Sequence, residues 1–123
     1  MPAPTTVNFS PAMTPRQLIP LLNATLLTPE LADLDSIQAA YASDRMSDVL
    51  EHAPAGAILI TLQNRAVAAG VAFEKHLPAI LLCHARTPEP NLLAHCRREK
   101  IVLLSTPLDQ FSASFRIGQL LLA

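Results

Sequence analysis

The sequence predicts an α/β fold: a mostly parallel sheet with helices packed on it, in three layers. Three short apolar runs, AILIT, AILLC and IVLLS, lie at 57–61, 79–83 and 101–105, and helix-type segments alternate with them. Strands that are apolar throughout are buried on both faces, as in a parallel sheet covered by helices. At 123 residues the chain has the length of one domain.

The elements before residue 57 are predicted from caps and chain breakers. A first helix begins after Thr14, with Pro15 in its first turn and Gln17 placed to complete a capping box. Pro20 limits or kinks this helix, because proline removes a backbone hydrogen bond. The other elements expected here are short strands at 25–28 and 36–42, separated by an acidic loop, and a helix within 43–56.

From residue 57 onward, strands and helices alternate regularly. For the last helix, Thr106 and Asp109 fit a capping box, and Pro107 takes the first helical position. We expect residues 1–13 to form a flexible N-terminal tail without signal-peptide character, and 14–123 to form a single domain. The remaining helices are expected within 64–76, 88–100 and 106–122.

Composition predicts self-association, most simply as a homodimer. Half of the residues are hydrophobic and 15% are charged, against about a quarter charged in an average globular domain. So few charges leave apolar surface for a second copy to cover. One candidate surface is the small-residue segment 66–73 around Gly70, whose alternative role is tight packing on its own sheet. The other is the last helix, where Phe111 and Phe115 lie one turn apart.

Charge and cysteine content exclude several classes of partner. A net charge of −1 gives no long-range attraction to nucleic acid or to an anionic membrane. The apolar runs are far shorter than the roughly 20 residues of a membrane-spanning helix. Two cysteines in apolar context fit free thiols in a reducing cytoplasm. We therefore expect a cytoplasmic protein that binds neither nucleic acid nor membrane.

The adjacent pairs Cys83-His84 and His95-Cys96 raise the question of a metal or catalytic site. Zinc ligands are typically spaced two to four residues apart, whereas the cysteine and histidine of each pair are adjacent. We expect buried core cysteines and no metal. The sequence has neither a Gly-rich phosphate loop ending in Lys-Ser/Thr nor a nucleophile elbow. We therefore expect no cofactor and no enzymatic activity.

The candidate ligand site lies where the strands end. Ligands of open parallel sheets bind outside the carboxyl ends of the strands, and three successive loops there each carry an arginine. Arginines and free N–H groups at helix starts suit a phosphate or carboxylate. The alternative is that these polar residues only cap helices and form turns. The candidate ligand-binding residues are Asp44, Arg45, Gln63, Asn64, Arg65, His84, Arg86, Thr87, Ser105 and Thr106.

Residues 41–64 and 77–117 resemble a DRTGG domain, over a match of about 14–119. The best-fitting pieces are Ser47-Asp48-Val49-Leu50, the Gly56 turn, Glu89-Pro90, and Ser105-Thr106 with Asp109 and Phe111. The resemblance implies a fold like the N-terminal domain of HPr kinase/phosphorylase. It also implies a regulatory or ligand-binding module, commonly dimeric, that occurs alone near hydrogenase genes or within phosphotransacetylases and CBS-domain pyrophosphatases.

The chain departs from the family pattern in two loops. It has Gln63-Asn64-Arg65 where the naming motif would follow the third strand, and His84-Ala85 where a glycine pair is usual. Losing two glycines removes easy close approach of the backbone to a ligand. Two functions therefore compete: a regulatory module that senses a small anionic metabolite or nucleotide, and an interaction module that docks onto a larger enzyme or assembly without a small ligand.

Overall fold

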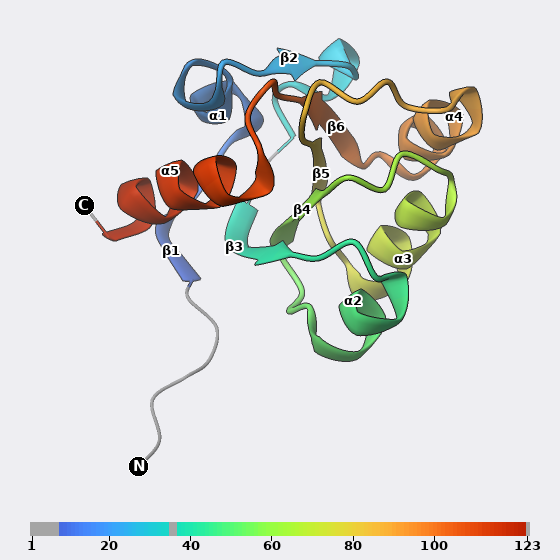
Figure 1. Ribbon diagram of the computed structural model, residues 1–123, viewed down its shortest axis with the longest axis horizontal. Helices are drawn as coiled ribbons and strands as arrows, with labels where there is room; N and C mark the ends of the chain where they lie inside the picture. The colour runs from blue at the N-terminus through green and yellow to red at the C-terminus, as the bar shows by residue number, and fades with distance from the viewer. Residues whose placement is uncertain (1–7, 35–36, 123) are drawn as a thin grey trace.

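The computed structural model describes residues 8–34 and 37–122, and they form a six-stranded mixed sheet with α-helices on both faces (Figure 1). The strand order is β1-β3-β4-β5-β6-β2. A short 3-10 turn, η1, spans Pro29–Leu31. The strands and α-helices are β1 (Asn8–Met13), α1 (Pro15–Leu22), β2 (Thr25–Leu26), β3 (Ile37–Ala42), α2 (Met46–His52), β4 (Ala57–Thr61), α3 (Val67–Lys75), β5 (Ala79–Leu82), α4 (Pro90–Glu99), β6 (Val102–Ser105) and α5 (Gln110–Leu122).

The four central strands β3, β4, β5 and β6 are parallel, as predicted, whereas the two edge strands are antiparallel to their neighbours. The edge strand β2 contains two residues, Thr25 and Leu26, which pair with Ser105 and Leu104 of β6. The sheet is therefore mixed, with a parallel centre. The antiparallel edges were not predicted, because pairing direction at an edge has no signature in the strand sequence itself.

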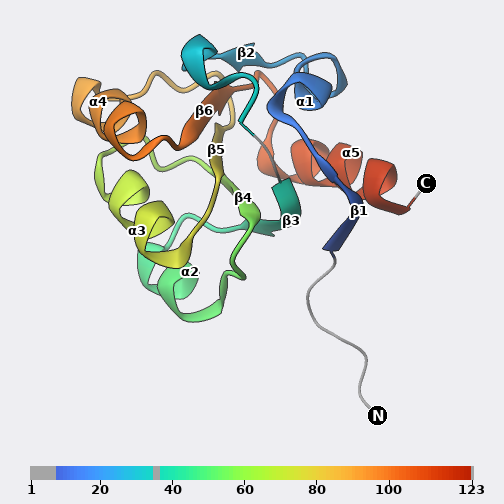
Figure 2. The same cartoon turned by 180° about the vertical axis from the view of Figure 1, so that it is seen from behind.

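Each face of the sheet has its own hydrophobic core. Ile58 and Ile60 of β4 pack in one core with residues of α1 and α5. Leu59, between them in the sequence, packs in the other core with residues of α2, α3 and α4. Figures 1 and 2 show the two groups of helices on opposite sides of the sheet. Burial on both faces is why the central strands lack the polar alternation of a half-exposed strand.

The N-terminal segment differs from its expected role as a tail. Residues 8–13 form β1, which pairs antiparallel with β3 through Asn8 opposite Ala39 and Met13 opposite Ile37. Met13 is buried in the core with α1 and α5. This strand was not predicted because it contains a proline at position 11 and has an irregular register. Both features are typical of an edge strand. The rest of the predicted tail, 1–7, lies outside the described residues.

The first helix starts as predicted, and the last one does not. The side chain of Gln17 accepts a hydrogen bond of 2.9 Å from the backbone N–H of Thr14, as in a capping box. In contrast, α5 begins only at Gln110, and the Asp109 carboxylate accepts from the Ser112 N–H at 2.6 Å. Asp109 is therefore the cap of α5, and the predicted cap Thr106 serves another purpose.

Thr106 is fully buried and ties three segments together. Its hydroxyl donates to the carbonyl of Leu22 at 2.6 Å and accepts from the N–H of Leu108 at 3.2 Å. The bond to Leu22 joins the end of α1 to the end of β6, 84 residues apart in the chain. A buried carbonyl without a partner costs about 1–3 kcal/mol, so this hydroxyl is a structural element rather than a group presented to solvent.

The small-residue segment of α3 is used inside the molecule. Ala68, Ala69 and Ala72 are buried in the core that α3 shares with α2, α4 and the sheet. A Cβ added at Gly70 would lie 3.8 Å from Cε1 of His95, an ordinary contact distance. These alanines pack inside the molecule, whereas Val67 and Phe73 of the same segment are exposed and Gly70 makes no close contact.

Both cysteines are free and buried. Burial raises the pKa of the Cys83 thiol to about 11, with a further rise from the charges of Asp109 and Asp44. Burial alone raises the pKa of Cys96 to about 12. Within the described ranges no group of three or more His, Cys, Asp or Glu side chains is arranged to hold a metal ion. No helix of those ranges is long and apolar enough to cross a membrane.

We expect both thiols to be unreactive in the folded protein. A raised pKa leaves the thiol protonated as pH rises, so at pH 8 a thiol with a pKa of about 11 is ionised in about one molecule in a thousand. A chromogenic thiol reagent should label neither cysteine at pH 8 without denaturant and should label both in denaturant. Stoichiometric labelling of the native protein would contradict the buried positions.

Candidate functional site

The carboxyl ends of β3, β4, β5 and β6 lie along one edge of the sheet, because these four strands are parallel and adjacent. The loops that follow them, 43–45, 62–66, 83–89 and 106–109, therefore gather at this edge. Every residue of the sequence-predicted ligand site lies in these loops or at the end of β6. We call this part of the molecule the carboxyl edge.

Asn64 joins the loop after β4 to the loop after β5. Its side-chain Nδ2 donates to the carbonyl of Thr87 at 2.7 Å, and its Oδ1 accepts from Nη2 of Arg86 at 3.1 Å. The backbone N–H of Glu89 donates to the Asn64 carbonyl at 2.9 Å. Three hydrogen bonds from one residue fix the relative position of the two loops and hold the guanidinium of Arg86 beside Asn64.

Arg65, next to Asn64, belongs to the same cluster. Its Nε lies 3.5 Å from Oε1 of Glu89, and the arginine side chain is 72% exposed. An ion pair this exposed is screened by water and holds the side chains only loosely. A guanidinium has five N–H donors, more than these contacts of Arg65 and Arg86 occupy, so both side chains can donate to a further acceptor. Asn64, Arg65, Arg86, Thr87 and Glu89 form what we call the two-arginine cluster.

Asp44 has a structural role that its sequence position does not reveal. Its Oδ1 accepts hydrogen bonds from the Thr61 hydroxyl at 3.1 Å, the Leu62 N–H at 2.7 Å and Nε2 of Gln110 at 3.1 Å. The carboxylate therefore ties the loop after β3 to the end of β4 and the start of α5. The N-cap of α2 is Arg45, not Asp44, so the capping role expected as the simplest explanation of Asp44 is wrong.

Gln63 is also used to shape its own loop. Its backbone N–H donates to the buried Thr61 hydroxyl at 3.0 Å, and its side-chain Oε1 accepts from the Arg65 N–H at 3.3 Å. Thr61 thus serves both Asp44 and Gln63, and the loop that carries Arg65 is held from both sides. Neither Thr61 nor Gln110 was predicted at the site, because Asp44, the partner that they share, lies 17 and 66 residues away from them in the sequence.

His84 and Ala85 both have left-handed backbone conformations, with φ of 55° and 51°. This conformation favours glycine, and it occurs at the two positions where the resemblance to the DRTGG family implies a glycine pair. The turn is held by the loop after β6, since the His84 N–H donates to Leu108 O at 2.8 Å and the Ala85 N–H donates to Thr106 O at 2.7 Å. The glycine-type turn persists here although its residues carry side chains.

The exposed His84 lies near Asp109. The pKa of Asp109 is lowered, first by the hydrogen bonds it receives from Ser112 and further by the charge of a protonated His84. Ser105 is half-buried at the end of β6, where it pairs with Leu82. His84, Ser105 and Asp109 thus lie at the part of the carboxyl edge from which α5 begins.

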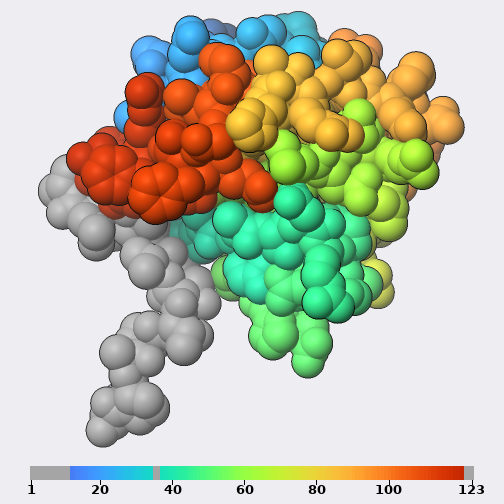
Figure 3. All heavy atoms as spheres, in the orientation of Figure 1, coloured from blue at the N-terminus to red at the C-terminus, as the bar shows by residue number. Residues whose placement is uncertain are grey.

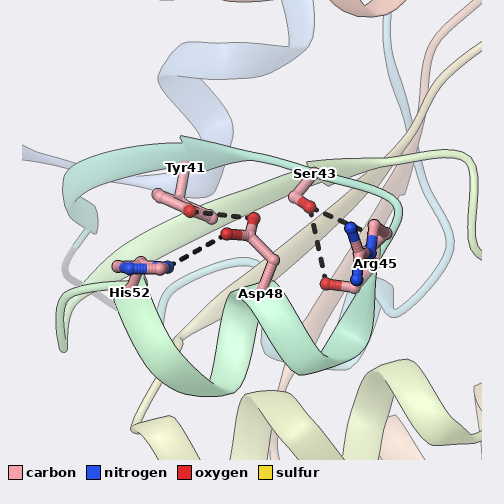
Figure 4. Close-up of polar contacts among 5 residues, drawn as sticks. All are labelled: Tyr41, Ser43, Arg45, Asp48 and His52. Carbon is pink, nitrogen blue, oxygen red and sulfur yellow. Dashed lines mark hydrogen bonds and ion pairs between the residues drawn. The ribbon is translucent and has the colours of Figure 1, made fainter.

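Arg45 is exposed at the start of α2, where its backbone N–H donates to the Ser43 hydroxyl at 3.2 Å (Figure 4). Among the described residues, no hydrogen bond or ion pair joins its guanidinium to the two-arginine cluster. The structure therefore links two of the three predicted arginines, Arg65 and Arg86, through contacts, and positions Arg45 one strand away.

A second polar network, missed at the sequence level, lies beside Arg45. Tyr41 donates its hydroxyl to Oδ2 of Asp48 at 2.9 Å, and Oδ1 of Asp48 lies 3.0 Å from Nδ1 of His52 (Figure 4). The pKa of Asp48 is lowered, chiefly by hydrogen bonds from the hydroxyls of Ser43 and Tyr41. The pKa of Tyr41 is raised, mainly because its hydroxyl is removed from water and less because of the Asp48 carboxylate beside it. The network fastens α2 to β3.

Comparisons with known proteins identify the family. The model of the DRTGG domain matches residues 17–120. A similar solved structure is that of the CBS and DRTGG domains of the regulatory region of Clostridium perfringens pyrophosphatase, complexed with its activator diadenosine tetraphosphate. The two structures match with a TM-score of 0.74 and a sequence identity of 19%. The alignment covers 88% of this chain and 47% of the pyrophosphatase chain.

This chain thus corresponds to about half the length of that regulatory region, and the similarity concerns the fold. No curated protein sequence matches the chain. The family model, by contrast, spans most of it, including β3 to β6 and all the loops of the carboxyl edge. The chain belongs to the DRTGG domain family.

Proposed function

We propose that this protein is a non-catalytic regulatory module that binds a small anionic metabolite or nucleotide at the carboxyl edge of its sheet. The observation that carries the proposal is the two-arginine cluster. Asn64 holds the loops of Arg65 and Arg86 together through hydrogen bonds of 2.7–3.1 Å, and both arginines remain exposed. Two guanidinium groups on loops that are hydrogen-bonded to each other suit the oxygens of a phosphate or carboxylate.

A nucleotide is the anion to test first. The regulatory region of the Clostridium perfringens pyrophosphatase is complexed with diadenosine tetraphosphate, a nucleotide activator. That fact concerns a protein with the same fold and 19% identity, so it suggests a ligand class for this chain without assigning one. Polyphosphates carry several acceptor oxygens, which would engage Arg65 and Arg86 together and reach toward Arg45.

The non-catalytic character is supported by how the polar groups at this edge are used. The Asp44 carboxylate receives three hydrogen bonds from its own chain, and the Thr106 hydroxyl is buried between two backbone partners. Groups committed in this way hold loops in position rather than exchange protons with a substrate. A cytoplasmic location completes the proposal, because both cysteines are free.

An interaction role is favoured by a specific surface. Phe111 and Phe115 on α5 are 80% and 56% exposed, and their rings stack with centroids 6.4 Å apart. The helix that carries them lies on the surface in Figure 3. We name Phe111 and Phe115 the α5 face. We propose that a second copy of this chain covers it to form a homodimer, with docking onto a larger enzyme as the competing outcome.

The anion proposal predicts selective effects of arginine substitutions. Sulfate, phosphate, ATP and diadenosine tetraphosphate, each at ionic strength matched with chloride, are titrated while the melting temperature is recorded. At least one should raise it saturably. Arg65→Gln and Arg86→Gln should each weaken that ligand about ten-fold or more, because a hydrogen bond to a charged group contributes about 1.5–3 kcal/mol.

Arg98→Gln is the matched control for Arg65→Gln. The Arg98 side chain is 65% exposed and its Nε lies 3.6 Å from Glu99, so it is a similar arginine in a similar ion pair far from the carboxyl edge. It should change the affinity by less than about two-fold, in line with the small contribution of exposed ion pairs. An equal loss in all three variants, or no anion effect in the parent protein, would refute the proposal.

The homodimer proposal predicts a change of mass. At micromolar concentration, size exclusion with light scattering should give the mass of two chains for the parent protein and of one chain for a folded Phe111→Ser/Phe115→Ser variant. Leu50→Ser on α2 removes a 39% exposed apolar side chain elsewhere and should leave the dimer intact. A parent protein that is monomeric, or a double variant that is still dimeric, would rule out this interface.

A further inference from the structure

A surface hollow of about 450 Å³ lies at the opposite edge of the sheet from the two-arginine cluster. Its lining comes from the segments that lead into β3, β4, β5 and β6, where these strands begin. We call it the amino-edge hollow. Its volume is within the range of about 300–1,000 Å³ that small-molecule sites occupy. The residues that determine its chemistry are Gln38, Phe73, His76, Leu77, Glu99 and Lys100.

Two helices end at this hollow. α3 ends at Lys75 and α4 at Glu99, and the residues after them, His76 and Lys100, have left-handed conformations with φ of 59° and 57°. Figure 2 shows both helices leading into β5 and β6. The last carbonyls of a helix carry its negative dipole end. Here the residues that follow each helix satisfy two of these carbonyls, and the rest of the last turn remains without such a cap. This end of the hollow therefore favours a cationic group and opposes a phosphate.

The rim of the hollow carries one carboxylate beside one ammonium. Glu99 and Lys100 are adjacent in the sequence, and both line the hollow. Glu99 is half-buried, with the Nε of Arg98 3.6 Å from its Oε1, whereas Lys100 is exposed. Opposite charges side by side suit a ligand that carries both signs itself, because each ligand charge then meets its complement.

Part of the wall of the hollow is apolar. Phe73, in the last turn of α3, is 56% exposed, and Leu77 lies buried beneath. An exposed phenyl ring next to a buried leucine offers a surface on which an apolar side chain can pack and lose contact with water.

We infer that the amino-edge hollow binds a small zwitterion with an apolar side chain, such as an aromatic α-amino acid. Its ammonium group meets Glu99 and the carboxyl ends of the two helices, its carboxylate meets Lys100, and its side chain packs on Phe73. The inference is independent of the anion site, because it uses none of the residues of the carboxyl edge.

Isothermal titration with L-phenylalanine and two analogues tests this assignment. L-Phenylalanine should bind saturably, whereas 3-phenylpropionate, which lacks the ammonium group, and 2-phenylethylamine, which lacks the carboxylate, should each bind at least about ten-fold more weakly. Phe73→Ser and Lys100→Asn should weaken L-phenylalanine to a similar degree. Asparagine is chosen at position 100 because it tolerates the left-handed conformation.

Val67→Ser is the matched control, since Val67 is a 49% exposed apolar residue at the other end of α3. It should leave the affinity unchanged, and circular dichroism should show all three variants folded. No saturable binding of L-phenylalanine, equal binding of an analogue, or an equal loss in Val67→Ser would overturn the inference. None of these results bears on the carboxyl edge, because Arg65 and Arg86 are intact in every variant.

Discussion

Burial of the central strands on both faces is the constraint on which the rest of the structure depends. All five residues of β4 and all four of β5 are buried, so neither face of the sheet is open to a ligand. Two groups of helices cover the faces. The sheet is left accessible where its parallel strands begin and end, at the amino and carboxyl edges, and there loops connect strands to helices. Polar groups that must meet water or a ligand are therefore concentrated at these edges, and both proposed sites lie there.

At the carboxyl edge, hydrogen bonds from distant segments of the chain hold the loops in place. His84 and Ala85 keep a left-handed turn without glycine, because their N–H groups bond to the loop after β6. Asp44 and Asn64 act in the same way on the other loops, each taking several partners from distant segments. The chain itself thus holds these loops, so a ligand of the proposed kind would meet a pre-organised site and a lower entropic cost of binding.

Features of the fold that depend on short-range sequence patterns could be predicted from the sequence. The apolar strands at 57–61, 79–83 and 101–105 and the start of α1 were recognisable, because burial and capping each leave a short-range signature. β1, whose pairing depends on β3, was missed, and Thr106 was assigned as a cap although Asp109 takes that position. At the site, the parallel-sheet rule placed the loops correctly, but the partners of Asp44 and Asn64 follow from tertiary packing that no local spacing encodes.

We propose that a small anion binds between the loops of Arg65 and Arg86. A nuclear magnetic resonance titration of the isotopically labelled protein with ATP tests its location residue by residue. We expect the largest changes of amide chemical shift within 62–66 and 83–89, together with changes in the side-chain Nε–H signals of the two arginines. Changes confined to the amino-edge hollow or to the α5 face, or no change at saturating ATP, would contradict it.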